Sequence, residues 1–121
     1  MLRGRYGIDR KLTAVGETNC AISEITVAEL LFGAEKSPDV KKKRQLIESA
    51  ISNLEIIPIA SSLNIFAREK ARLSKAGMII SDFDLLIGAT AIANDLILVT
   101  NNVKHFERLE GIRIENWISN S

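Results

Sequence analysis

The sequence predicts an α/β domain built on a largely parallel β-sheet. Helical and strand-like patterns alternate along its 121 residues, and this alternation is typical of parallel sheets with helices on their faces. Hydrophobic residues make up 46% and charged residues 26% of the chain, which is the composition of an ordinary packed protein. A chain of this length supports one hydrophobic core and is too short for two. We therefore expect residues 1–121 to form a single domain.

The elements follow from hydrophobic periodicity and from capping residues. Ser23 is placed to cap one helix, Ser37 with Pro38 matches the start of another, and Gly77 ends a third. In chain order we expect a helix over 9–15, a strand over 19–22, helices over 24–35 and 38–54, a buried strand around 56–59, helices over 62–76 and 81–94, and strands over 96–100 and 112–114. The helix over 24–35 is apolar on nearly every side, so we expect both of its faces to be covered within the core.

Charge and cysteine content exclude several classes of function. The 16 Lys and Arg against 15 Asp and Glu give a net charge of +1, so overall charge provides no argument for binding nucleic acid or membranes. One cysteine and one histidine cannot form a zinc cluster of Cys and His ligands, a disulfide or a redox pair within one chain. No apolar run approaches the ~20 residues that cross a bilayer. We expect a cytoplasmic protein without membrane contact.

Glu29 is the first candidate for chemistry. It is a lone carboxylate among apolar neighbours of its helix, and a desolvated carboxylate needs a compensating metal ion or other cation. A position at the helix edge, where the side chain reaches solvent, would explain it equally well. Glu24, in the first turn of the same helix, favourably meets the helix dipole and is interpreted as structural.

Asp82 and Asp84 form the second candidate, at the start of an otherwise apolar helix. The spacing from Ser81 to Asp84 also fits a capping arrangement, which alone could account for Asp84. Residues 76–100 nevertheless carry three aspartates and no Lys or Arg, so a local negative charge of this size favours a bound cation. Oxygen ligands without a zinc-type cluster indicate Mg²⁺ or Mn²⁺.

The third candidate is the end of the strand over 96–100. It delivers Thr100, Asn101 and Asn102 to the carboxyl edge of the sheet, where open α/β sheets bind ligands. Ordinary turn chemistry would also place asparagine there. His105 is interpreted as a surface or core histidine, because the chain has no GxSxG segment for a hydrolase triad. A phospho-acceptor domain fits poorly, since the paired acids start a helix rather than end a strand.

Three strings together resemble a known family. ISEITVAELLFGAEKS, ISDFDLLIGATAIANDLILVTNNVKHF and GIRIENW look like the PIN-domain endoribonucleases, especially the VapC-type toxins of bacterial toxin–antitoxin modules. The resemblance implies a three-layer α/β/α sandwich with a parallel sheet, in which acids bind Mg²⁺ or Mn²⁺ and metal-activated water cuts RNA. It also implies inhibition of translation and growth, a cognate antitoxin and, commonly, a homodimer. Carried over, Glu29 and Asp84 are the catalytic and metal-binding acids, Asp82 is an auxiliary acid, and Thr100 and Asn102 are auxiliary polar residues.

The chain departs from the family pattern at two places. The family's fourth acid follows the strand that ends in Thr, and Asn102 and His105 are the candidates here, neither of them an acid. The family's first strand, which ends in a catalytic Asp, is not found before the segment LRGRYGIDRKL. We expect such a chain to be a poor nuclease with a marginal fold. The competing hypothesis is a weak or inactive PIN-like protein that only binds an antitoxin.

Basic residues supply a possible track for RNA around the acidic residues. Solvated helix faces explain each cluster equally well when the clusters are taken singly. The candidates are Arg3, Arg5, Arg10 and Lys11, the run Lys41, Lys42, Lys43 and Arg44, and Arg68, Lys70, Arg72 and Lys75 on one helix.

Overall fold

The computed structural model describes residues 20–116 and contains helices and parallel strands. The helix expected over 9–15 and the family's first strand lie outside these residues and stay predictions. The described elements, in order, are β1 (Ala21–Ser23), α2 (Glu24–Glu35), α3 (Val40–Ile51), β2 (Glu55–Ile57), η2 (Ile59–Ser62), α4 (Leu63–Lys75), α5 (Asp82–Ala93), β3 (Ile97–Val99), α6 (Val103–Phe106) and β4 (Arg113–Glu115).

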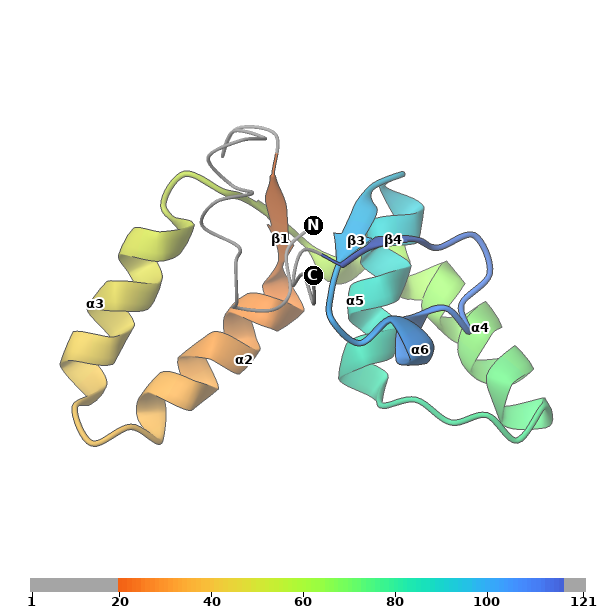
Figure 1. Ribbon diagram of the computed structural model, residues 1–121, viewed down its shortest axis with the longest axis horizontal. Coiled ribbons are helices and arrows are strands. Elements are labelled where there is room, and N and C mark those ends of the chain that lie inside the picture. Colours follow the sequence, from red (N-terminus) through yellow and green to blue (C-terminus); the bar gives the residue numbers. More distant parts are fainter. Residues whose placement is uncertain (1–19, 117–121) are drawn as a thin grey trace.

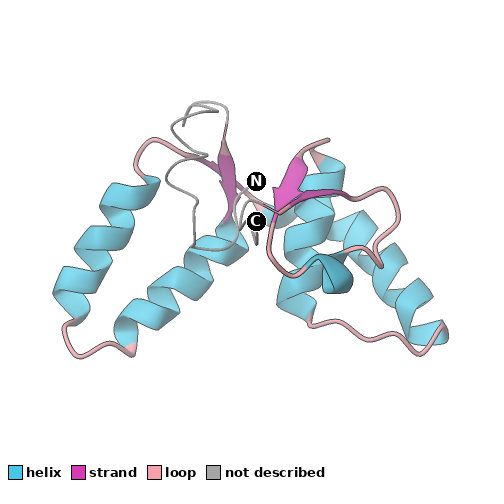
Figure 2. Cartoon of the chain, viewed as in Figure 1, coloured by secondary structure: helices cyan, strands magenta, loops and turns pink. Residues whose placement is uncertain are grey.

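The described strands form two parallel pairs. β1 pairs with β2, with Ala21 opposite Glu55, and β3 pairs with β4, with Ile97 opposite Arg113. Helices connect the members of each pair, as parallel pairing requires. Figure 1 shows α2 and α3 beside the first pair and α4, α5 and α6 beside the second, and Figure 2 shows the helices flanking both pairs. The expected α/β architecture with parallel strands is confirmed.

Helix α5 is the centre of the main hydrophobic core. Its Leu85 and Ile87 are buried against Leu98 of β3, Phe106 of α6 and Leu73 of α4. The helix is made almost entirely of apolar and small residues, so it can be covered on several sides at once. This agrees with the apolar pattern of the sequence over 81–94.

Two of the expected helix caps are confirmed. The Ser23 hydroxyl oxygen accepts a hydrogen bond from the Ile25 N–H at 3.1 Å, and the Ser81 hydroxyl oxygen accepts one from the Asp84 N–H at 3.2 Å. Each cap satisfies a backbone donor that the first helical turn leaves without an intrahelical partner. The caps therefore fix where α2 and α5 begin. These are the helices that carry Glu29 and Asp84.

The expectation that the helix over 24–35 is a core helix is wrong. Only Thr26 and Ala34 of α2 are buried, and the Phe32 side chain is 64% exposed. The helix contacts α3, β1 and α5, while Ala28, Phe32 and Gly33 are exposed. Helix α2 therefore exposes apolar side chains to solvent within the described part of the chain.

The boundaries around α3 and β2 also differ from expectation. Asp39 caps α3 by accepting the Lys42 N–H at 3.1 Å, while the Ser37 hydroxyl donates to the Ala34 carbonyl at 2.7 Å. Ser37 therefore closes α2 rather than opening α3. In β2 only Ile57 is buried, and Ile56 is 47% exposed. Pro58 follows the strand and leads into η2.

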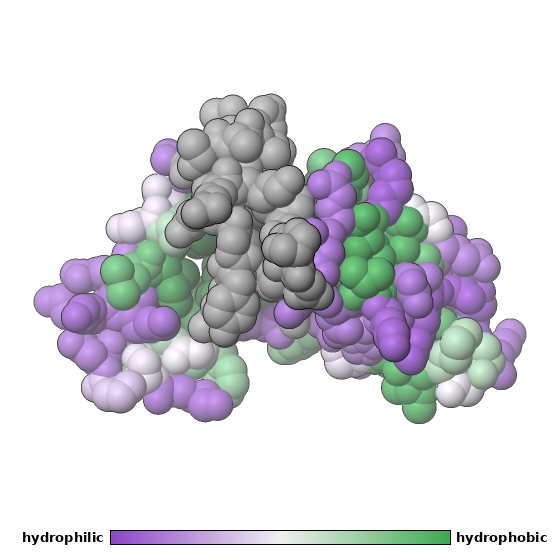
Figure 3. Space-filling model, viewed as in Figure 1, coloured by the Kyte–Doolittle hydropathy of each residue, from purple (hydrophilic) through white to green (hydrophobic). Residues whose placement is uncertain are grey.

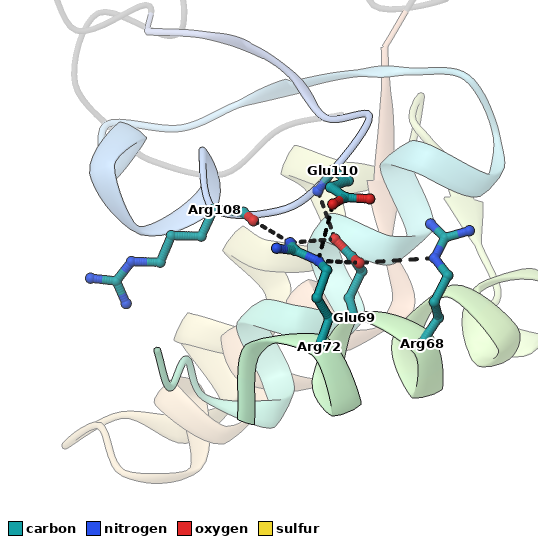
Figure 4. A network of polar contacts seen from close by, with 5 residues as sticks. All are labelled: Arg68, Glu69, Arg72, Arg108 and Glu110. Carbon is teal, nitrogen blue, oxygen red and sulfur yellow. Dashed lines mark hydrogen bonds and ion pairs between the residues drawn. The ribbon is translucent and has the colours of Figure 1, made fainter. Parts of the chain in front are cut away.

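A buried carboxylate joins α4 to the segment after α6 (Figure 4). Glu69 is fully enclosed and accepts hydrogen bonds from Nε and Nη2 of Arg72, each at 2.9 Å, and from the Glu110 N–H at 2.6 Å. Arg72 also donates to the Arg108 carbonyl at 2.6 Å. These bonds lower the pKa of Glu69, with Arg72 as the main cause and burial opposing it. The network ties two segments that are about 40 residues apart in sequence.

The first prediction concerns this network. Replacing Glu69 by Gln should lower the free energy of unfolding at neutral pH by about 2 kcal/mol, because Arg72 loses its charged acceptor. The pKa of Glu69 in the folded chain lies below its usual value, so its stabilisation is fully present above the pKa of the unfolded chain and is lost as the pH falls through the folded pKa. Urea unfolding across this range should show less acid sensitivity in the variant.

The control for this prediction is Glu35→Gln. Glu35 pairs with Arg44 at 3.3 Å, but its side chain is 59% exposed, and exposed pairs contribute about 0 to 1 kcal/mol. Equal effects of the Glu69 and Glu35 substitutions on unfolding would contradict the assigned role of the buried network.

The second prediction compares two helical glycines. A Cβ added at Gly88 in α5 would overlap Leu109 and press on Phe106, whereas one at Gly33 in α2 meets nothing within 4 Å. Overpacking a core costs about 1 to 3 kcal/mol, and alanine is favoured over glycine in a helix by about 0.5 to 1 kcal/mol. Thermal unfolding should show Gly88→Ala to be destabilising and Gly33→Ala to be stabilising. The same sign for both would contradict the close packing at Gly88.

Candidate active site

Asp84 lies in the first turn of α5, where the Ser81 cap fixes the start of the helix. Its side chain is only 14% exposed, and its Oδ2 lies 3.3 Å from Nδ1 of His105. A carboxylate in the first turn is favoured by the helix dipole. The position therefore keeps a partly shielded negative charge beside an imidazole.

The residues that follow β3 supply the other side chains near Asp84. Thr100 is buried, and its hydroxyl oxygen accepts the Asn102 N–H at 3.1 Å. This bond bends the chain into α6, which begins after Asn102 and carries His105. Nδ2 of Asn102 lies 3.1 Å from Nδ1 of His105. The structure thus links Asn102 to Asp84 through His105, and Thr100 holds the loop at the carboxyl end of β3 that carries Asn102.

Asp82 points elsewhere. It forms an ion pair with Lys70 of α4 at 2.9 Å, and both side chains are about half exposed. Residues two apart in a helix lie on different sides of it, so Asp82 and Asp84 cannot both face His105. The catalytic and metal-binding role expected for Asp82 stays a prediction. Its described partner is Lys70.

Glu24 and Glu29 are distinguished by their surroundings. Oε1 of Glu24 accepts the Ile59 N–H at 2.6 Å, which confirms that Glu24 is structural because it fixes the turn after β2. Glu29 lies one helical turn further along α2 and is partly buried. Across residues 20–116 no three His, Cys, Asp or Glu side chains form a group that could hold a metal ion. The metal-binding role of Glu29 stays a prediction.

Several of the expected RNA-binding cations have other partners. On α4, Lys70 pairs with Asp82 and Arg72 with Glu69, while Arg68 lies 3.8 Å from the same Glu69. These pairs neutralise much of that helix face. On α3 the run Lys41, Lys42 and Lys43 is exposed and remains the strongest described candidate for a phosphate contact. The basic residues at positions 3, 5, 10 and 11 lie outside the described residues.

The contacts of His105 are the feature that sequence reasoning missed. His105 is a non-acidic candidate at the family's fourth acidic position and is interpreted from the sequence as a surface or core histidine, yet it contacts both Asp84 and Asn102. Its three-residue spacing from Asn102 is a local signal, since such residues meet on one side of a helical turn. Its contact with Asp84, which is 21 positions away, has no local signal. Only the packing of α6 against α5 creates it.

Asp84 contributes carboxylate oxygens, which are ligands that Mg²⁺ and Mn²⁺ accept. Asn102 turns its amide nitrogen Nδ2 toward His105, and Thr100 holds the loop that carries Asn102. The binding of a divalent ion here stays a prediction.

Comparison with known proteins identifies the family. The model of the PIN domain matches residues 4–112, which include both halves of the site. The chain belongs to the PIN-domain family. It is 43% identical over 98 residues to Ribonuclease VapC2 of Haemophilus influenzae, covering 80% of this chain and 74% of that protein. It is 38% identical over 97 residues to the tRNA(fMet)-specific endonuclease VapC of Salmonella typhimurium, covering 79% of this chain and 74% of that protein.

Solved VapBC structures share the fold of this PIN-domain chain. The structure of VapBC2 from Rickettsia felis, bound to a DNA fragment from their promoter, superposes with a TM-score of 0.86 at 35% identity, covering 93% of this chain and 86% of that one. DNA-bound VapBC from Salmonella typhimurium gives a TM-score of 0.87 at 32% identity with the same coverage. The PIN-like fold and the VapC-type resemblance of the sequence are confirmed. Within residues 20–116 no helix is both long and apolar enough to cross a membrane.

Proposed function

We propose that this chain is a metal-dependent endoribonuclease toxin that cleaves RNA phosphodiester bonds, inhibits translation and growth, and is neutralised by a cognate antitoxin. The observation that carries the proposal is the shielded Asp84 carboxylate beside His105 and Asn102 at the carboxyl end of β3, in a chain of the PIN-domain family. The ribonuclease and endonuclease names of the VapC relatives support it.

In this proposal Asp84 and Glu29 hold Mg²⁺ or Mn²⁺, with Asp82 as an auxiliary acid. The bound ion would supply positive charge against the phosphate and would lower the pKa of a water molecule. Asp84 is oriented by the Ser81 cap and by His105. Thr100 holds the loop that carries Asn102, and the exposed lysines of α3 attract the RNA backbone.

The second candidate function is an antitoxin-binding protein without nuclease activity. It is favoured by the residues at the family's fourth acidic position, because Asn102 and His105 supply no carboxylate. It is favoured also because no group of three metal-ligating His, Cys, Asp or Glu side chains occurs among residues 20–116. The two functions differ in a single measurable property, the metal-dependent cleavage of RNA.

The third prediction tests the nuclease. Purified chain with Mn²⁺ should cleave RNA, and Asp84→Asn should reduce the rate about 100-fold or more, because removal of one directly placed charge in such sites has costs of this order. Asp82→Asn should reduce it much less, since Asp82 faces Lys70. The rate is measured on a labelled RNA with and without EDTA.

The control for the nuclease assay is Glu107→Gln, which alters an exposed carboxylate next to α6 and should leave the rate unchanged. An equal loss in the Asp82 and Asp84 variants would contradict the placement of the site. Absence of any metal-dependent cleavage by the wild-type chain would favour the antitoxin-binding function.

We infer that the antitoxin binds across α2 and α3. Phe32 of α2 and Leu46 of α3 are 64% and 57% exposed, and Figure 3 shows hydrophobic side chains among hydrophilic ones over this hairpin. A shallow hollow of about 370 Å³ lies at the start of α3, where Pro38, Lys42 and Leu46 line it. Exposed apolar side chains of this kind accept the apolar side of a partner helix. The VapBC complexes among the structural relatives support a protein partner.

The fourth prediction tests this surface. Co-expression with the neighbouring gene of the native operon should yield a stoichiometric complex with the antitoxin. Phe32→Ser and Leu46→Ser should each weaken it about tenfold or more, because an apolar anchor contributes about 1 to 3 kcal/mol. Leu63→Ser, which alters a similarly exposed leucine on α4, is the matched control. Equal weakening by all three substitutions would contradict the assigned surface, and recovery of the chain alone would contradict the partner.

Homodimer formation and a cytoplasmic location complete the proposal. Ile79 and Phe83, in and after the loop between α4 and α5, are 81% and 53% exposed and offer apolar surface to a second copy. Cys20 is buried and is not part of a disulfide, which suits a reducing compartment. Sedimentation of the purified chain measures the dimer directly.

A further inference from the structure

Helix α6 is a single turn, and it carries His105 to Asp84. So short a helix is not stable on its own in water, so its position is set by the chain on either side of it. On the side where the helix begins, the Thr100 hydroxyl oxygen accepts the Asn102 N–H. Its last residue is buried in the core. The third support of the helix lies in the chain that follows it.

Helix α4 holds that following chain by its backbone groups (Figure 4). Nη2 of Arg72 donates to the Arg108 carbonyl at 2.6 Å, and the Glu110 N–H donates to Oε1 of Glu69 at 2.6 Å. Glu69 also accepts from Nε and Nη2 of Arg72, so the two side chains hold each other in place. We call these bonds of Glu69 and Arg72 to residues 108–110 the α4 clamp. Because the clamp binds main-chain atoms, it fixes the path of the chain whichever side chains stand there.

The clamped segment is also connected to the start of α5. The Arg108 guanidinium donates to the Ile79 carbonyl at 3.3 Å, in the loop that leads to α5. Between the two clamped residues, Leu109 is buried and lies against Gly88 of α5. The segment therefore joins α4 to both elements that meet at the contact between Asp84 and His105.

We propose that Glu69 and Arg72 are positioning residues for the contact between His105 and Asp84. They act through the backbone of residues 108–110 and through α6, which those residues follow. A buried charge pair adds little net stability compared with apolar packing, and its best-attested contribution is to select one arrangement of the chain. The kinetic part of the inference rests on the proposed nuclease function, whereas the placement of His105 can be measured without it.

The first test compares wild type with Glu69→Gln by NMR, on the full chain at one neutral pH and without RNA. Glutamine has one acceptor oxygen where the carboxylate has two, so one of the two donors of Arg72 loses its acceptor. The chain has one histidine, so every imidazole signal in a nitrogen–proton spectrum belongs to His105. These signals should move in Glu69→Gln by more than their line width, because the imidazole shifts away from Asp84.

The second test measures the cleavage of a labelled RNA. Glu69→Gln should lower kcat about 10- to 100-fold, because small misplacements of groups at a reacting centre have costs of this order. It should leave KM nearly unchanged, since the lysines proposed to attract RNA lie on α3. A change that only loosened the fold would not separate kcat from KM at a temperature where the variant is folded.

Two matched controls should leave the His105 signals and kcat unchanged. Glu110→Gln removes a carboxylate that lies 3.5 Å from Nε of Arg72, but that side chain is 68% exposed and the clamping N–H stays. Ile47→Ala removes a buried side chain of α3, which packs on α2, and lowers the melting temperature without touching the clamp. Arg72→Lys is a second clamp variant in case Glu69→Gln fails to fold. It keeps the charge but lacks the fork that binds the carboxylate and the Arg108 carbonyl together, so it should move the His105 signals as well.

The outcomes separate this inference from the proposed function. Unchanged His105 signals in both clamp variants would overturn the inference, and so would an equal movement in Ile47→Ala, which would indicate general loosening. Moved signals with an unchanged kcat would overturn the step from placement to catalysis. Moved signals in a chain whose wild type cleaves no RNA would support the positioning role and contradict the nuclease proposal.

Discussion

The close contact between Gly88 of α5 and the pair Phe106 and Leu109 is the constraint on which the site depends. Because Gly88 has no side chain, α6 and the segment after it can approach the helix axis. Gly88 lies one turn beyond Asp84, on the same side of α5. The core contact that seats Phe106 therefore also carries His105, its neighbour in α6, to the Asp84 carboxylate. The apolar packing and the polar site both result from the close approach of α6 to α5 at Gly88.

The Glu69 network also holds the segment that follows α6. Arg72 binds the carbonyl of Arg108, and Glu69 binds the N–H of Glu110, so α4 holds the chain just after α6. A buried charge pair of this kind adds little net stability compared with apolar packing, but it is costly to break. Its contribution here is positional, because it restricts the segment that joins α6 to β4. The polar network and the core contact both act on the end of α6 and the residues just after it.

The α2–α3 hairpin has a different character from this well-packed half. Its helices contact each other, yet α2 leaves most of its apolar residues partly or fully exposed in the described part of the chain. Apolar surface of this extent is costly in water and favours a partner. This exposed apolar surface is the basis of the proposal that the antitoxin binds the hairpin. Lys36 over the Phe32 ring, at 5.1 Å, shields a small part of the exposed surface.

The sequence alone determined the order of helices and strands, the caps at Ser23 and Ser81, and the positions of Asp84 and Thr100, because these depend on local periodicity and on hydrogen bonds between neighbours. It did not determine the exposure of α2. An apolar pattern shows which side chains a helix can bury, and the elements packed against the helix determine which of them are buried. Nor did it determine the pairing of Asp84 with His105. That contact joins residues 21 positions apart, and it exists only because α6 packs against the glycine of α5.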